Sequence, residues 1–424
     1  MYLESVEKLV NSLCELDIPL VFGGAFASMF PERFLDGKAR FVIRADGEIP
    51  MTKLAGAIEA GADYTQIPSL CYRKEDGEIV VNEIGDILEE IDGYGLPVIH
   101  SPEACYIEHD ALTEGDPQLS SLSYEVIASR GCPFTCSYCC CVNLHRLFPK
   151  GTKYVRTRSV ESVIAELIEA KKQLKNLVFV HFYDEIFPNT PGWIDQFIVE
   201  YKKHIHLPFT IWSHPKMVRE DELKKLVSVG LTEVIMGIQS GSPYIRKEIF
   251  HRYETQQDII EATRIIRRSG VFWSSYDFML QHPFEKIEHL KETYELVRQL
   301  AMPLELQLHG LNFLPGTDIV EMAIGQGLIT REEMDKIMYA PMKAQFDAYW
   351  KREDERESRL WYRLIYCLQF KNCRKKCDLY AQDIDKYEQA IDQMYAQCEK
   401  RAKNRYYYKK GRVVLRSFRM RLFK

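Results

Sequence analysis

Five cysteines lie in the segment GCPFTCSYCCC, residues 131–141, and their spacing is the strongest chemical signal in the chain. Cys132, Cys136 and Cys139 have the spacing C-x3-C-x2-C. Thiolates are soft ligands that select zinc, Cu(I) or iron–sulfur clusters. A zinc finger needs a second ligand pair at a fixed offset, and no such pair follows here. Three thiolates therefore predict an iron–sulfur cluster with one open metal position, which is what a catalytic site requires.

Cys140 and Cys141 follow directly, and we do not expect them to be ligands of the same cluster. Neighbouring Cα atoms are only about 3.8 Å apart. The chain would need a sharp reversal to bring either thiol to the opposite corner of the cluster. We expect these two cysteines to be packing residues.

The elements around the cysteines form a repeating pattern of short apolar strands and amphipathic helices. The expected strands are residues 124–129, 177–183, 209–213, 233–238, 272–280 and 304–314. Between them lie helical stretches such as 160–174, with apolar residues at positions 163, 164, 167 and 168. Strands that alternate with helices predict a parallel sheet, either doubly wound or curled into a barrel. Ligands bind at the carboxyl ends of such strands, and the cysteines follow the first strand.

Composition excludes several classes of protein. The chain has 424 residues, of which 46% are hydrophobic and 28% charged, as in an ordinary globular protein. We find no apolar run near the length of about 18 residues that a membrane helix needs. The acidic N-terminus does not resemble a signal peptide. Twelve cysteines without an export signal therefore favour a reduced, cytoplasmic location and metal binding over disulfides.

The cysteine spacing, with Tyr138 before the third cysteine and a strand before the first, resembles the radical S-adenosylmethionine superfamily. The resemblance covers residues 121–330. It implies an α/β fold with a partial (β/α)6 TIM-like barrel, and a [4Fe–4S] cluster on the three spaced cysteines. S-adenosylmethionine would chelate the open iron, with Tyr138 in its pocket. An electron from the cluster would then cleave a carbon–sulfur bond and leave methionine and a 5′-deoxyadenosyl radical.

Other motifs that follow the expected strands strengthen this resemblance. FYDEIF is similar to the acidic stretch that holds the methionine amino group, which implicates Asp184 and Glu185. MGIQSGS is similar to a signature near the ribose and methionine groups, which implicates Gln239 and Ser240. Arg252 stands where relatives carry an arginine for the carboxylate.

The turn after the sixth strand, FLPGT (313–317), also resembles the family. The fifth strand departs from it, because QHPFE (281–285) stands where relatives commonly have G-x-P-G-E. The departure falls in the segment that, by the resemblance, would form the lower part of the cofactor pocket.

The first 98 residues resemble the latter half of a cobalamin-binding, Rossmann-like domain. Gly23 and Gly24 follow an expected strand, and in that family such a pair lets the nucleotide tail of the cofactor approach the backbone. The family's D-x-H-x-x-G motif is missing, and no histidine precedes His100. We therefore expect an incomplete domain that packs against the barrel or a partner. Cobalamin binding by this chain stays open, with the expectation of poor affinity.

Residues 340–424 are expected to be a helical C-terminal region with a basic tail. Cys367, Cys373, Cys377 and Cys398 either hold a second cluster or are buried packing residues. Residues 400–424 contain 11 Lys or Arg and no acid, together with Tyr406–Tyr408, Leu415, Phe418 and Phe423. The alternatives for this tail are a solvated or core-packed end, peripheral contact with an anionic membrane, and nucleic acid, in that order.

Three functions fit these patterns. The first is a cobalamin-family methyltransferase that acts on an unactivated carbon in a small molecule, lipid or peptide, with a reductase or flavodoxin-type electron donor. The second is a radical enzyme without cobalamin, such as a tRNA methylthiotransferase, for which the resemblance implies a β-rich C-terminal module. The third is a non-catalytic cluster protein such as an electron carrier, which would not need Gln239, Ser240 and Arg252.

Overall fold

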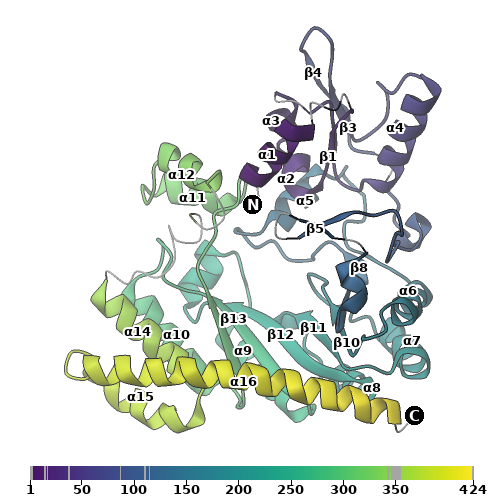
Figure 1. The fold of residues 1–424 in the computed structure, drawn as a ribbon. Helices are drawn as coiled ribbons and strands as arrows, with labels where there is room; N and C mark the ends of the chain where they lie inside the picture. Colours follow the sequence, from purple (N-terminus) through teal and green to yellow (C-terminus); the bar gives the residue numbers. More distant parts are fainter. Residues whose placement is uncertain are drawn as a thin grey trace.

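The computed structural model describes residues 3–13, 16, 18–36, 39–85, 87–108, 111–113, 115–340, 344 and 355–422. An N-terminal α/β region, a central six-stranded sheet with its helices, and a helical C-terminal region follow one another along the chain (Figure 1). Phe423 lies outside the described residues. No described helix combines the length and the apolar character that crossing a membrane requires.

The N-terminal region is a four-stranded sheet with helices. Its elements are α1 (Leu3–Leu13), β1 (Val21–Phe22), α2 (Gly24–Met29), α3 (Pro31–Leu35), β2 (Phe41–Ile43), α4 (Glu48–Ala60), β3 (Leu70–Arg73) and β4 (Ile79–Val81). β1 and β2 pair in parallel, whereas β2–β3 and β3–β4 are antiparallel. Gly77, with φ +92°, allows the tight turn between β3 and β4. This hairpin covers the edge of β2 that two Rossmann-like strands alone would leave unpaired.

The central sheet consists of six parallel strands in the order β14-β13-β12-β11-β10-β7. They are β7 (Ser123–Val126), β10 (Phe179–Phe182), β11 (Phe209–Ser213), β12 (Leu231–Gln239), β13 (Trp273–Met279) and β14 (Glu305–His309). All six lie where the sequence predicts them. The predicted α/β fold with a six-stranded (β/α) core is confirmed, and β14 and β7 are the two edges of an open sheet.

Helices alternate with these strands. They are α5 (Cys140–Leu147), α6 (Val160–Gln173), α7 (Pro191–Glu200), α8 (Glu220–Val229), α9 (Gln256–Arg268), α10 (Ile287–Gln299), α11 (Asp318–Gly325) and α12 (Arg331–Met338). Two small antiparallel pairs complete this part, β5 (Tyr106–Glu108) with β6 (Ala111–Thr113) and β8 (Ser129–Arg130) with β9 (Arg156–Thr157). In α6, the Ser159 side chain caps the helix by accepting from the Ser162 N–H.

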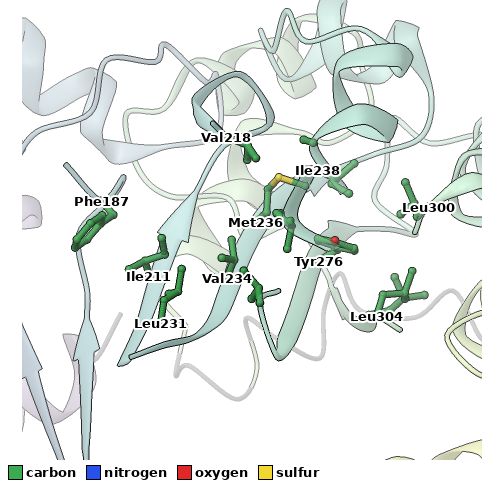
Figure 2. Packing of buried hydrophobic residues seen from close by; sticks show 14 of the residues in the cluster. Phe187, Ile211, Val218, Leu231, Val234, Met236, Ile238, Tyr276, Leu300 and Leu304 are labelled. Atoms are coloured by element: carbon green, nitrogen blue, oxygen red, sulfur yellow. The ribbon is translucent and has the colours of Figure 1, made fainter. Parts of the chain in front are cut away.

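A large hydrophobic core joins the sheet to its helices. Figure 2 shows part of it, with Ile211 of β11, Val234 and Met236 of β12, and Tyr276 of β13. These four side chains are at most 3% exposed. Burial of each large apolar side chain contributes about 1.5–3 kcal/mol, so the core holds the sheet in the register that positions the loops above it.

The C-terminal region contains α14 (Arg356–Cys367), α15 (Arg374–Tyr380) and the long α16 (Glu388–Leu422). α16, drawn in yellow in Figure 1, crosses the lower ends of the strands. Lys409 of α16 forms ion pairs with Glu233 at the start of β12 and Glu305 at the start of β14. Arg405 donates to the Leu304 carbonyl at 2.6 Å. This part of the basic tail is therefore packed against the core.

The four C-terminal cysteines lie together in the main hydrophobic core. Cys367, Cys377 and Cys398 are fully buried, and Cys373 is 5% exposed. The sulfur atoms of Cys373 and Cys398 are 3.6 Å apart. Two thiols in contact leave no room for a cluster between them, so the structure favours the packing interpretation.

Candidate active site

The cysteine loop, residues 131–139, follows β7 and β8 at the carboxyl end of the sheet. Hydrogen bonds to the backbone of other segments fix its position. The Ser137 N–H donates to the Phe250 carbonyl at 3.1 Å, and the Ser137 hydroxyl donates to the Ile249 carbonyl at 2.5 Å. The Ile319 N–H donates to the Ser137 carbonyl at 3.1 Å. These bonds join the loop to two segments more than 100 residues away, so the loop is held in place by the rest of the α/β core and not by its own contacts alone.

Gly131 begins this loop and cannot be replaced without a shift of backbone. Its φ is +85°, and a Cβ there would lie 2.6 Å from the Tyr154 carbonyl oxygen. The turn lets β8 pair with β9 beside the first cysteine. A glycine is therefore required at position 131 because the Tyr154 carbonyl lies too close for any side chain.

Cys132, Cys136 and Cys139 lie close enough for the charge of each to act on the others, and burial raises the pKa of Cys132 to about 11. In the described part of the chain, no three His, Cys, Asp or Glu side chains surround one point closely enough to hold a single metal ion. A [4Fe–4S] cluster is larger, and each thiolate binds a different iron, so its cysteines need not converge on one ion. The three-thiol donor set fits such a cluster.

Cys140 and Cys141 form the start of α5, and their thiols contact that of Cys139. The Tyr154 hydroxyl donates to the Cys141 carbonyl at 2.9 Å. The Cys141 sulfur is 3.9 Å from Oε1 of Glu185. These two cysteines thus line the same place as the spaced three, although the sequence predicted only packing residues. Because α5 begins directly after Cys139, the side chains of Cys140 and Cys141 lie beside that of Cys139.

Arg252 lies beside Cys136 of the cysteine loop and is 6% exposed. Its Nη1 is 3.3 Å from the Tyr138 hydroxyl and 4.0 Å from the Cys136 sulfur. Its Nη2 donates to the Gly237 carbonyl at 2.7 Å, and its Nε donates to Glu254 at 2.7 Å. Burial raises the pKa of Cys136 overall, and the guanidinium charge of Arg252 and the Tyr138 hydroxyl offset part of that rise. Arg252 and Tyr138 therefore favour the thiolate form of Cys136, which is the form that a metal would require.

Sequence reasoning missed the residues that hold Arg252 in place. Glu254 is 3% exposed, and its Oε2 lies 3.4 Å from Nε2 of His214. The His214 ring stacks on Phe134 of the cysteine loop at a centroid distance of 3.8 Å. His214 directly follows β11, and a polar residue after a buried strand was the signal that could have revealed it.

Gln239 ends β12 in the left-handed region, with φ +71°. Its amide nitrogen lies over Gly237, where a Cβ would be 2.6 Å from Gln239 Nε2 and 3.8 Å from Arg252 Nη1. Gln239, Gly237 and Arg252 thus form one polar wall beside Cys136. Ser240 points elsewhere, because it is fully buried and its hydroxyl accepts from the Ser242 N–H at 3.1 Å.

The acidic pair after β10 divides into two roles. Glu185 faces the thiols and lines a large cavity. Asp184 is 2% exposed and turns inward, where its Oδ1 accepts from the Ala128 N–H at 3.0 Å and the Ser129 hydroxyl at 2.6 Å. Burial raises the pKa of Asp184 to about 7. Asp184 therefore supports the backbone before the cysteine loop. The sequence predicted that both carboxylates face the cofactor, whereas the structure turns only Glu185 toward the thiols.

A cavity of about 630 Å³ separates the N-terminal region from the sheet and reaches Glu185. Gly24 lines it, with φ +86° and no atom within 4 Å of the place that a Cβ would take, so a ligand can approach its backbone. Gly23 lies deeper, and a Cβ there would be 3.8 Å from the Ile43 carbonyl oxygen. The open surface at Gly24 fits an approach by cobalamin, and no histidine of residues 1–99 is present to act as its lower ligand.

Ion pairs, of which only that of Asp46 with Arg156 is buried, join the N-terminal region to the β8–β9 pair at the rim of this cavity. Asp46 pairs with Arg156 and, at 3.2 Å, with Arg130. Arg130 also pairs with Glu48, and the Tyr94 hydroxyl donates to Asp46 at 2.8 Å. These contacts link Asp46 and Glu48 of the N-terminal region to β8 and β9, as we expect of a region that packs against the rest of the chain or a partner.

Comparisons with known proteins agree with this geometry. The family model of the radical SAM superfamily matches residues 126–297. An uncharacterized methyltransferase of Pyrococcus horikoshii is 25% identical over 331 residues, which is 77% of this chain and 67% of that protein.

Two solved structures share the fold. The cobalamin-dependent S-adenosylmethionine radical enzyme OxsB with aqua-cobalamin has a TM-score of 0.63 and 15% identity, covering 98% of this chain and 73% of that chain. The radical S-adenosylmethionine methyltransferase TsrM from Kitasatospora setae, with tryptophan substrate and a SAM analogue, has a TM-score of 0.60 and 19% identity, covering 77% of this chain and 61% of that chain. The chain thus spans less than two thirds of the length of TsrM.

The family match covers the cysteine loop, the acidic pair and the Gln239–Arg252 wall, all at the carboxyl end of one parallel sheet. Residues 126–297 of this chain are therefore a radical S-adenosylmethionine domain.

Proposed function

We propose that this protein is a methyltransferase of the radical S-adenosylmethionine type that acts on a small molecule. The observation that carries the proposal is the convergence of Cys132, Cys136 and Cys139 with Arg252 and Glu185 beside a cavity of about 630 Å³. That volume lies within the range of about 300–1,000 Å³ that is usual for small-molecule sites.

Each side chain of the site has a task in this proposal. The three spaced cysteines hold a [4Fe–4S] cluster, which when bound supplies the electron that cleaves a carbon–sulfur bond of S-adenosylmethionine. Glu185, which faces the thiols, accepts hydrogen bonds from the cofactor's amino group. Gln239 donates from its amide beside Gly237, and Arg252 places positive charge next to Cys136 and the cofactor's carboxylate.

Methyl transfer is supported by the Pyrococcus relative, which is named a methyltransferase, and by the fold shared with TsrM and OxsB. Cobalamin would lie against Gly24 in the cavity and would carry the methyl group there, without a histidine ligand from residues 1–99. A flavodoxin-type or reductase partner would deliver the electrons. Residues 356–422 are helical, whereas the resemblance to a tRNA methylthiotransferase implies a β-rich module in this part of the chain.

The cluster assignment is tested in protein reconstituted anaerobically with iron and sulfide. Replacement of Cys132, Cys136 or Cys139 by Ala should abolish the brown absorbance and the formation of 5′-deoxyadenosine or other cleavage products from S-adenosylmethionine. Cys140→Ala should keep most of the iron, and Cys105→Ala, an exposed cysteine, is the matched control. Loss of the cluster in Cys140→Ala together with its retention in Cys136→Ala would reject the assignment.

Cobalamin and methyl transfer need their own measurements. Titration of the full chain with hydroxocobalamin should show weak binding, and the bound form should lack the spectrum of a histidine-ligated cobalt. Tight, stoichiometric binding would contradict the weak-affinity part of the proposal. Label from methyl-labelled S-adenosylmethionine should enter a small molecule of a cell extract. Its absence, with cofactor cleavage intact, would contradict methyl transfer.

A further inference from the structure

A second cavity lies at the other end of the sheet from the cysteines. It has a volume of about 270 Å³ and separates α16 from the first residues of β12 and from Phe272, which directly precedes β13. Thr232 and Phe272 form its sheet side, and the remaining lining comes from α16, namely Arg412, Val413, Leu415, Arg416 and Arg419. Figure 1 shows this part of α16 near its C-terminal end, below the sheet. Nothing in the proposed methyl transfer uses this cavity.

The cavity is strongly basic. Arg412, Arg416 and Arg419 are spaced i, i+4 and i+7, so they share one face of α16. No acidic residue lines the cavity, and residues 400–424 contain none. Within the described part of the chain, none of these three arginines pairs with a carboxylate. The cavity therefore carries three positive charges without a counter-charge.

Basic residues in the earlier part of the same helix, unlike these three arginines, have partners. Lys409 is neutralised by Glu233 and Glu305, and Arg405 donates to the Leu304 carbonyl. Further along the helix, Arg416 is half-buried, and burial lowers its pKa with no carboxylate to offset the effect. A partly desolvated guanidinium without a partner is costly, and a bound anion would remove that cost.

We propose that this cavity binds the phosphate group of a small soluble ligand. Guanidinium groups present a planar fork of N–H donors that matches phosphate oxygens, and three of them surround one space here. The volume is below the usual range for a whole drug-sized ligand, about 300–1,000 Å³, so the bound group is small, such as a phosphate or diphosphate. Phe272, Val413 and Leu415 give the ligand's carbon atoms an apolar wall.

The probe for this site is inorganic pyrophosphate, added to the full-length protein. It should raise the melting temperature, compared with sodium chloride at equal ionic strength. Arg416→Gln and Arg412→Gln should each weaken pyrophosphate binding about 10- to 100-fold, the usual effect of losing one charged hydrogen bond. The matched control is Lys403→Gln, which removes an exposed charge of α16 about 20 Å from Arg416 along the helix.

Three outcomes would overturn the proposal. The first is no effect of pyrophosphate beyond that of sodium chloride. The second is equal affinity in Arg416→Gln and Lys403→Gln, with both variants folded as judged by circular dichroism. The third is co-sedimentation with vesicles of phosphatidylserine and phosphatidylcholine without any pyrophosphate binding, which would assign the arginines to a lipid surface. Cofactor cleavage by Arg416→Gln should stay at the level of the unmodified protein, which separates this site from the proposed function.

Discussion

The ion pair between Arg252 and Glu254 allows a sharp test of how the site is held together. Arg252 Nε and Glu254 Oε1 are 2.7 Å apart, and the two side chains are 5% and 0% exposed. Glu254→Gln keeps the size of the side chain but removes its charge. The guanidinium is then buried without a counter-charge, and loss of one partner of a buried pair costs about 3–5 kcal/mol.

The lowered pKa of Glu254 gives a similar value for the contribution of this ion pair to the free energy of unfolding. Burial alone would raise this pKa, but the hydrogen bond from His214 and the charge of Arg252 outweigh it and lower the pKa from 4.5 to about 2. A shift of this size corresponds to about 3 kcal/mol. Because the folded-state pKa is lowered, this stabilisation is fully present above pH 4.5 and is lost as the pH falls toward 2. Glu254→Gln should remove both the stabilisation at pH 7 and its loss in that acidic range.

The measurement is urea unfolding at pH 7, followed by tryptophan fluorescence. The matched control is Glu321→Gln, which breaks the exposed pair with Arg331 and should change the unfolding free energy little. Arg252→Met combined with Glu254→Gln should recover part of the loss, because neither charge then remains buried. A loss in Glu254→Gln no larger than that in Glu321→Gln would refute the reasoning.

Three further predictions test two supports of the site and the packing of α16. Gly131→Ala should lower the melting temperature and the iron content after reconstitution, because the new Cβ would lie 2.6 Å from the Tyr154 carbonyl oxygen. The control is Gly115→Ala, where φ is similar at +82° and no atom lies within 4 Å of the new Cβ. Asp184→Asn should flatten the decline in melting temperature between pH 4 and pH 7, since a carboxyl whose pKa is raised by burial to about 7 loses stabilisation as the pH rises through that window. An unchanged pH profile would contradict this. Lys409→Met should lower the melting temperature more than Lys403→Met, because it leaves Glu233 without its cation.

Much of the fold and part of the site were predictable from local patterns. Runs such as FTIWS (209–213) are short, apolar and bounded by helical segments, and the structure has a strand over the same residues. The spacing C-x3-C-x2-C constrains three thiols to one loop whatever the rest of the chain does. Such features depend on residues a few positions apart, so the sequence by itself determines them.

Contacts between distant strands were decided by the tertiary structure. Asp184 and Glu185 are adjacent, and only the register of β10 against β7 turns the first toward Ser129 and the second toward the thiols. The anchoring of Arg252 by Glu254 needs His214 from the loop after β11, and no local pattern encodes that distance.

The basic tail shows the same division. Its charge was plain in the sequence, where residues 400–424 have no acid to balance 11 Lys or Arg. Whether those charges meet solvent, a surface or the core depends on where α16 lies. The packing of α16 under the sheet buries Lys409 against Glu233 and leaves Arg416, about two turns later, beside an open cavity. Composition determined the charge, and packing determined its partners, because ion pairs form between residues that only the folded chain brings within reach.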